Sequence, residues 1–180
     1  MEVSEYRPRI KEALAESLHV LGVIMLNLGD EARARPFFEE SLSLYREIGN
    51  RRGIALTLVY FGHLALYDGD EALAQSYFTH ALDLAREVGP NWYKGDCLKG
   101  FAGLAAVRGE ARRAARLWGA AEAALVAAAS YMDNGDCIFF GRILSAAQAQ
   151  LGEAAFEAAR AEGRAMTLEQ AVAYALEPSQ

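Results

Sequence analysis

The chain lacks the residues and segments that disulfide-bonded, zinc-binding or membrane-spanning proteins need. Its 180 residues contain two cysteines, Cys97 and Cys137, and neither lies in a CxxC or Cys/His cluster. We therefore expect two buried, reduced thiols instead of a disulfide framework or a zinc site. The longest apolar stretch, residues 54–67, is interrupted by His63 and is shorter than the roughly 20 residues of a membrane helix. Charged side chains are spread through the first 20 residues, so a signal peptide is missing and a cytoplasmic protein is predicted.

Catalytic motifs and an excess of positive charge are also missing. Lysine and arginine number 18 against 24 aspartates and glutamates, a net charge of -6. This balance argues against a general affinity for nucleic acid or anionic membranes. The three histidines form no HExxH pair, and the chain has neither a GxxxxGK[ST] phosphate loop nor a GxSxG elbow. We expect a non-enzymatic chain with no cofactor, metal, nucleic-acid or membrane ligand.

What the sequence does contain is a repeat with a period of 40 residues. Gly29-Asp30-Glu31-Ala32 returns as Gly69-Asp70-Glu71-Ala72 and, more weakly, as Gly109-Glu110-Ala111. A degenerate fourth copy follows, and its register slips at Gly152-Glu153. We predict one array over residues 1–180, with units at about 9–50, 51–90 and 91–130 and a degenerate unit with a cap at 131–180.

Each unit has the pattern of two helices joined by a tight turn, because apolar residues recur three and four apart on both sides of the Gly-Asp pair. The glycine can end one helix in the left-handed conformation, and Asp30 or Asp70 can then cap the next. Glu110 is a poorer cap, which predicts a less firmly set third turn. Pro8 fits the start of a helix, whereas Pro36 falls in the second turn of one and predicts a kink.

Small and bulky residues are placed for interdigitation between helices. Gly22, Gly62 and Ala102 allow close approach, and the bulky Phe38, Phe78 and Trp118 are expected beside Ala34, Ala74 and Ala114.

Apolar segments in the last third of the chain need cover. Residues 120–129 are apolar nearly all round, and residues 92–93 and 138–140 are bulky, so either the degenerate unit or another subunit is expected to bury them. Thr167-Leu168-Glu169-Gln170 fits a capping box and predicts a short final helix through Ala171 to Leu176 that covers the end of the array.

The arrangement resembles the tetratricopeptide repeat. Leu21-Gly22, Gly29, Ala34, Phe38 and Ser41 match its motif, and Phe61-Gly62, Gly69, Ala74, Phe78 and Ala81 match it again. The period of 40 departs from the usual 34, and the closing proline is absent. A period near 40 also fits HEAT-like repeats, but the small and aromatic positions favour the tetratricopeptide. The resemblance implies an all-α, right-handed tetratricopeptide-like α-α superhelix with a C-terminal capping helix.

A narrower resemblance extends over most of the chain. The strings at residues 38–49, 115–122 and 151–171 are similar to the C-terminal helical tail of bacterial signalling proteins, which include LuxR-type regulators with an NB-ARC-like ATPase. This resemblance implies a sensing or docking arm of a bacterial signalling protein or transcriptional regulator.

The tetratricopeptide resemblance also implies a concave face lined by the first helix of each unit. We predict that a partner contacts Glu16, His19, Val23, Asn27, Val59, His63, Tyr67, Asp96 and Lys99, with Leu56, Gly103 and Val107 beside them. For each residue the alternative is solvent exposure or packing on a neighbouring helix. A lining of this mixed kind suits an amphipathic peptide, a protein partner or a small-molecule effector. His19 and His63 could approach each other and bind a metal weakly or respond to pH, but ordinary groove histidines are the favoured interpretation.

Arg108, Arg112, Arg113 and Arg116 form the one cationic cluster. It could meet phosphate or an acidic partner, although a solvated face balanced by Glu110 is favoured. The leading function is thus a non-enzymatic interaction or ligand-sensing module. Self-association through the later apolar helices is the second hypothesis, and an enzyme with a dispersed site is the third.

Overall fold

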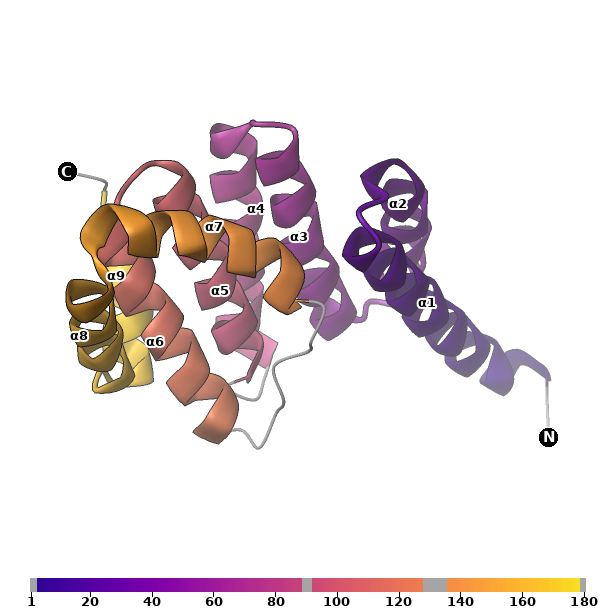
Figure 1. The fold of residues 1–180 in the computed structure, drawn as a ribbon. Helices are drawn as coiled ribbons and strands as arrows, with labels where there is room; N and C mark the ends of the chain where they lie inside the picture. The colour runs from indigo at the N-terminus through magenta and orange to yellow at the C-terminus, as the bar shows by residue number, and fades with distance from the viewer. Residues whose placement is uncertain (1–2, 89–91, 128–135, 179–180) are drawn as a thin grey trace.

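The computed structural model describes residues 3–88, 92–127 and 136–178, and within them the chain is all-helical (Figure 1). The helices are α1 (Val3–Asn27), α2 (Glu31–Glu47), α3 (Arg51–Tyr67), α4 (Glu71–Val88), α5 (Trp92–Val107), α6 (Ala111–Ala127), α7 (Asp136–Leu151), α8 (Glu153–Arg164) and α9 (Leu168–Leu176). None of these helices is long and apolar enough to cross a membrane. The side chains of Trp92, Cys137 and residues 138–140, for which burial was expected, lie outside the described part of the chain.

The Gly-Asp turns form as predicted. Gly29, Gly69 and Gly109 have φ of 74°, 76° and 76°, and each ends a helix in the left-handed region. The carboxylate of Asp30 accepts the Arg33 amide at 3.0 Å, and the carboxylate of Asp70 accepts the Leu73 amide at 2.9 Å. The sequence therefore ends one helix and caps the next at neighbouring residues.

A second turn, which separates the first unit from the second, was not foreseen. Gly49 has φ of 68°, and Asn50 accepts the Gly53 amide on its side-chain oxygen at 3.0 Å. The Gly-Asn pair thus acts between α2 and α3 as the Gly-Asp pair acts within a unit.

The first six helices pack as adjacent pairs, α1 with α2, α3 with α4 and α5 with α6, and stack into a tetratricopeptide-like superhelix. The Phe38 ring lies over Gly22, where an added Cβ would come within 2.7 Å of it. The Phe78 ring fills the same position over Gly62 and also meets Gly100. Ala34, Ala74 and Ala114 are fully buried. Phe38 and Phe78 therefore interdigitate with small residues, and the residues that receive their rings are glycines of the first helices.

The last three helices depart from the paired pattern. α7 packs on α5 and α6 and reaches α1, while α8 packs mainly on α6 and to a smaller extent on α7. The α6–α8 crossing has no room for side chains, because a Cβ on Gly119 would overlap the Arg160 carbonyl and a Cβ on Gly163 would overlap the Arg116 carbonyl. Ala121 and Leu125 of α6 are buried and lie beside Gly95 of α5. The chain itself thus buries part of the apolar helix that could have needed another subunit, whereas Val126 at its end is 78% exposed.

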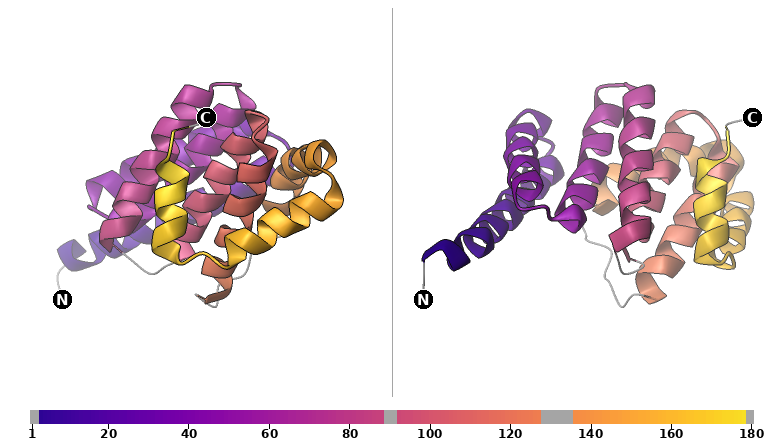
Figure 2. Two further views of the ribbon diagram at one scale, coloured as in Figure 1. Left: turned by 90° about the vertical axis from the view of Figure 1, so that its left-hand side faces the viewer. Right: turned by 180° about the vertical axis from the view of Figure 1, so that it is seen from behind.

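The capping box and the final helix form as predicted. Thr167 Oγ1 accepts the Gln170 amide at 3.2 Å, and Gln170 Oε1 accepts the Thr167 amide at 2.8 Å. α9 then packs on α5 and α6 at the end of the array opposite to α1, as the two views in Figure 2 show.

The prolines leave the helices continuous. α1 begins at Val3, so Pro8 lies inside it and not at its start, which corrects the expectation. α2 runs through Pro36 to Glu47. The turn between α5 and α6 has glutamate, Glu110, where the other two have aspartate. Its backbone hydrogen bonds are nevertheless the same, and the Glu110 amide donates to the Ala105 carbonyl at 2.9 Å.

Candidate functional site

The predicted partner-contacting residues lie on α1, α3 and α5 but differ in burial. Glu16 and Tyr67 are exposed, and Val23, Asn27 and Asp96 are half-buried. The other four are buried within the protein: His19, Val59, His63 and Lys99. The face expected to be open is therefore closed over much of its length.

Helix α7 accounts for part of this closure. In Figure 1 it runs across the array in front of α5. Its Leu144 and Ala147 are buried in the same hydrophobic cluster as Val59 of α3 and as Cys97 and Phe101 of α5. The period-40 pattern contained no signal for this course, because the fourth copy is degenerate and its register slips.

The two histidines contact the Tyr60 ring edge-to-face from two sides and do not form a pair. Ring centroids lie 4.9 Å apart for His19 and Tyr60, and 5.4 Å apart for Tyr60 and His63. Burial lowers the pKa of His19 to about 4, and burial with the nearby Lys99 charge lowers the pKa of His63 to about 3. Both rings are neutral at pH 7. Among the described residues no three His, Cys, Asp or Glu side chains gather as a metal site.

A buried ion pair lies on α5 beside His63. Lys99 Nζ lies 2.6 Å from Asp96 Oδ1, and the two side chains are only 5% and 17% exposed. Cys97, between them in sequence, is a free thiol whose pKa is raised by burial. A buried protonated thiol is a poor nucleophile, so Cys97 has the inert, structural character that the sequence predicted.

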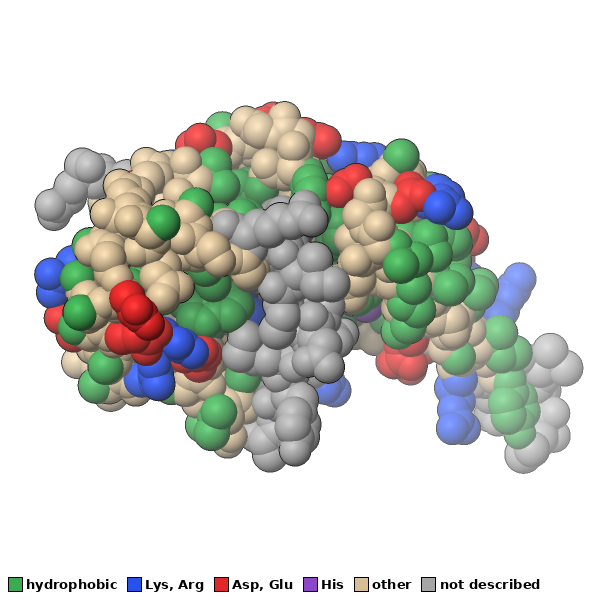
Figure 3. All heavy atoms as spheres, viewed as in Figure 1, with side chains coloured by type: hydrophobic (Ala, Val, Ile, Leu, Met, Phe, Trp, Pro, Cys, Tyr) green, Lys and Arg blue, Asp and Glu red, His purple; other side chains and the backbone are tan. Residues whose placement is uncertain are grey.

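A pocket of about 710 Å³ remains open at the N-terminal end of the array, where α1, the end of α2 and the start of α3 meet. Glu16 and His19, two of the predicted partner-contacting residues, line it, but the sequence did not single out most of the other lining residues. The further lining residues are Pro8, Arg9, Glu12, Val20, Tyr45, Ile48, Asn50, Arg52, Gly53, Leu56 and Tyr93. In Figure 3 the molecular surface is hollowed beside α1.

Local structure explains how the pocket wall is held. The Asn50 amide donates to Glu12 Oε1 at 2.9 Å, which ties the α2–α3 turn to α1. The Arg52 guanidinium donates to the Tyr93 hydroxyl at 3.0 Å and lies over its ring. The sequence contained one usable signal for Glu12, since it precedes Glu16 by four residues and so shares a helix face with it.

Glu12 and Glu16 give the pocket negative charge on its α1 side. The pKa of Tyr45 is raised to about 12, first by burial and then by the charges of Glu16 and Glu12. Arg9 and Arg52 also line the pocket, so the lining is mixed, with its negative charge at Glu12 and Glu16.

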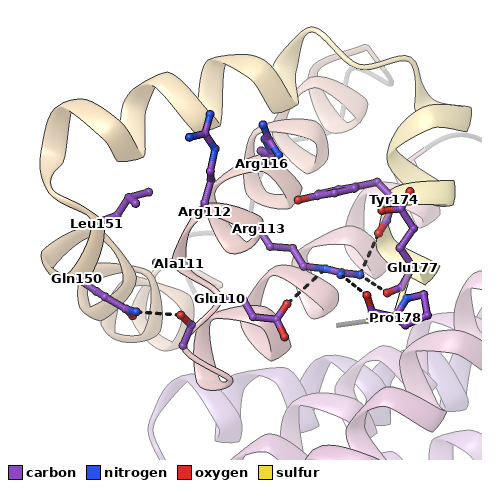
Figure 4. A pocket seen from close by; sticks show the side chains of 11 residues that line it. Glu110, Ala111, Arg112, Arg113, Arg116, Gln150, Leu151, Tyr174, Glu177 and Pro178 are labelled. Atoms are coloured by element: carbon purple, nitrogen blue, oxygen red, sulfur yellow. Dashed lines mark hydrogen bonds and ion pairs between the residues drawn. The ribbon is translucent and has the colours of Figure 1, made fainter. Parts of the chain in front are cut away.

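The arginine cluster lines a second pocket, of about 500 Å³, under the C-terminal cap (Figure 4). Arg113 donates to the carbonyls of Tyr174 and Glu177 at 3.0 and 2.6 Å and so binds the last turn of α9. Arg112 and Arg116 both donate to Glu162 of α8, at 2.8 and 2.6 Å. These guanidinium groups attach α8 and α9 to the array.

Comparison with known proteins covers the first helix pair. Residues 15–48 match the tetratricopeptide repeat model. The match runs from Ala15 of α1 to Ile48 at the end of α2, so it includes Glu16, His19 and the Phe38–Gly22 contact. No curated protein and no solved structure matches the chain. The tetratricopeptide match and the helical stack support a protein-interaction module.

Proposed function

We propose that the chain is a non-enzymatic module that binds a peptide segment of a protein partner in the pocket beside α1, and that this segment carries lysine or arginine next to aliphatic residues. The observation that carries the proposal is the position of two glutamates on an open pocket within the tetratricopeptide-like unit.

The charge of the pocket favours a cationic segment. Glu16 is exposed and has no ion-pair or hydrogen-bond partner among the described residues, while Glu12 accepts one hydrogen bond from Asn50. Burial and then the charges of these two glutamates raise the pKa of Tyr45. A lysine or arginine bound beside Glu12 and Glu16 would meet their negative charge, while Arg9 and Arg52 line other parts of the same pocket. Val20 and Leu56 supply apolar lining for neighbouring side chains.

Glutamines in place of the two glutamates test this site. A fluorescent peptide of alternating lysine and leucine is titrated with the chain, with the fluorescence anisotropy as readout. Each exposed ion pair contributes about 0.2–1 kcal/mol. The variant with both Glu12→Gln and Glu16→Gln loses two such pairs, so its binding should weaken about two- to thirty-fold. Glu39→Gln with Glu40→Gln is the matched control, since these exposed glutamates of α2 lie off the pocket and change the net charge equally. Equal weakening in both variants would count against the pocket.

A small-molecule effector is a second candidate ligand, because about 710 Å³ lies within the range of ligand pockets, roughly 300–1,000 Å³. A thermal-shift screen of metabolites tests it. A hit must lose its effect when Tyr45→Ala and Glu16→Gln are introduced.

We also propose that the module serves a cytoplasmic bacterial signalling protein or transcriptional regulator. The support is the resemblance of residues 38–49, 115–122 and 151–171 to the helical tails of such regulators. The test is the full open reading frame around this segment, where an ATPase domain with a phosphate loop is expected upstream. A frame without any such domain contradicts this context and leaves the peptide site untouched.

A further inference from the structure

A stripe of exposed aliphatic side chains runs along α1. Ile10, Leu14, Leu21, Ile24 and Leu28 are 64%, 47%, 41%, 45% and 71% exposed. With Ser17 they follow the spacing 4, 3, 4, 3, 4, which places all six on one helix face without a charged residue. Figure 3 shows hydrophobic side chains gathered along this helix. We call these six residues the α1 stripe.

The repeat identifies the α1 stripe as a stacking face. At an offset of 40 residues, Leu21 and Ile24 correspond to Phe61 and Leu64 of α3, which are 7% and 0% exposed. Phe61 packs on the second helix of the preceding unit, with its ring centroid 6.3 Å from that of Phe38.

The third unit repeats this packing. Phe101 and Leu104 of α5 are 4% and 3% exposed, and the Phe101 ring lies 5.8 Å from that of Phe78 on α4. The positions that pack on a neighbouring unit everywhere else in the array are thus exposed to solvent on α1.

The two ends of the array differ in this respect. α9 covers α5 and α6 at the C-terminal end. Seven of the twelve large hydrophobic residues that are exposed in the described chain lie between Tyr6 and Leu28. A continuous exposed apolar patch on the order of a few hundred Å² is often functional, so this face is a candidate interaction site.

We propose that the α1 stripe is the interface of a homodimer in which two α1 helices pack antiparallel about a two-fold axis. The spacing of the stripe reads the same in both directions. In an antiparallel pair, large aliphatic side chains therefore face large ones, and the small Ser17 faces a leucine. Ile10 then meets Leu28 of the partner subunit, Leu14 meets the partner's Ile24, and Ser17 meets the partner's Leu21.

Charge favours this antiparallel register. Arg7 continues the spacing of the α1 stripe three residues before Ile10, and it is exposed. A parallel pair would bring Arg7 against its own copy. Antiparallel packing separates the two arginines and is therefore favoured over parallel packing.

The size of the surface suits a reversible dimer. An apolar patch of this extent is on the order of 500 Å². Two such patches bury about 1,000 Å², which is at the lower limit for a specific interface. We expect dimers at micromolar concentrations of chain.

Sedimentation equilibrium of the full chain at tens of micromolar tests the dimer. The expected mass is about twice 19.6 kDa, and Leu21→Glu with Ile24→Glu should halve it without changing the helical circular dichroism. Leu73→Glu, an equally exposed leucine on α4, is the control and should stay dimeric. A monomeric native chain overturns the proposal and leaves the stripe to a helix of another protein. Persistence of the dimer in the double variant overturns it too.

Disulfide trapping tests the register. A mixture of Leu14→Cys and Ile24→Cys chains should cross-link on mild oxidation, because these positions face each other in the antiparallel pair. Either variant alone should not, since ten residues along a helix separate its two copies by about 15 Å. The chain without introduced cysteines gives the background. Cross-linking of Leu14→Cys alone at the level of the mixture would show a parallel pair and contradict the proposal.

Discussion

The substitution Gly163→Ala, which adds one methyl group, should force α8 away from α6. Gly163 lies on α8, where α8 crosses α6, and a Cβ at this position would overlap the carbonyl carbon and oxygen of Arg116. Those atoms belong to the backbone of α6, which is buried and hydrogen-bonded through the crossing. No rotamer change can relieve the overlap, so the helices must separate.

The magnitude follows from two opposing terms. Alanine is a better helix former than glycine by about 1 kcal/mol. Overpacking against a rigid neighbour costs about 1–3 kcal/mol, and the upper end applies because the overlap falls far inside the 3.0 Å that real Cβ atoms keep. Gly163→Ala should therefore lower the free energy of unfolding by about 2 kcal/mol. For a chain of this length the midpoint temperature should fall by about 4–8 °C.

Thermal unfolding followed by circular dichroism at the helix band measures the effect. Gly141→Ala on α7 is the matched control, because a Cβ there has nothing within 4 Å and only the propensity gain remains. The two substitutions should move the midpoint in opposite directions. A Gly163→Ala chain as stable as the Gly141→Ala chain would refute the account of the α6–α8 crossing.

Three further predictions concern acid, the capping box and the arginine anchor. Burial lowers the folded pKa values of His19 and His63 to about 4 and 3, below the usual 6.5, so between 6.5 and these values the unfolded chain binds more protons than the folded chain. The free energy of unfolding, measured by urea titration, should therefore fall by about 1 kcal/mol per histidine from pH 7.5 to 5.5, and His63→Asn should reduce this fall. Thr167→Ala removes one half of the capping box and should cost about 1 kcal/mol in the same assay. Arg113→Ala should speed hydrogen exchange in α9, because its carbonyl contacts are lost; unchanged exchange would contradict the anchor.

Local chemistry explains why the turns and the stacking could be predicted. Gly29 and Asp30 act through bonds to their own neighbours, and the Phe38–Gly22 contact joins two helices linked by that same turn. Such features repeat with the sequence period because each depends on one unit. The capping box at Thr167 is local in the same way.

The course of α7 and α8 depends on contacts that no local pattern encodes. Gly119 and Gly163 are the two residues that permit the α6–α8 crossing, and they lie 44 positions apart in a region where the repeat has lost its register. The predicted partner face was read from the register alone. Of its residues, Glu16 lies on a pocket, whereas His63 and Lys99 are buried, which the register could not foresee.

The pocket and the α1 stripe lie on different sides of α1, so a peptide and a second copy of the chain could bind at the same time. At about 100° per residue, Glu12 and Glu16 lie roughly 140° around the helix from the α1 stripe. A dimer formed through the stripe would therefore leave both pockets open and present two of them to one partner. A partner with two cationic segments would gain avidity from the dimer, whereas a single short peptide would not. The chain with Leu21→Glu and Ile24→Glu should accordingly bind the single lysine-leucine peptide as tightly as the native chain, and only a tandem copy of that peptide should bind it less tightly. Equal loss for both peptides would mean that the pocket and the stripe are one site.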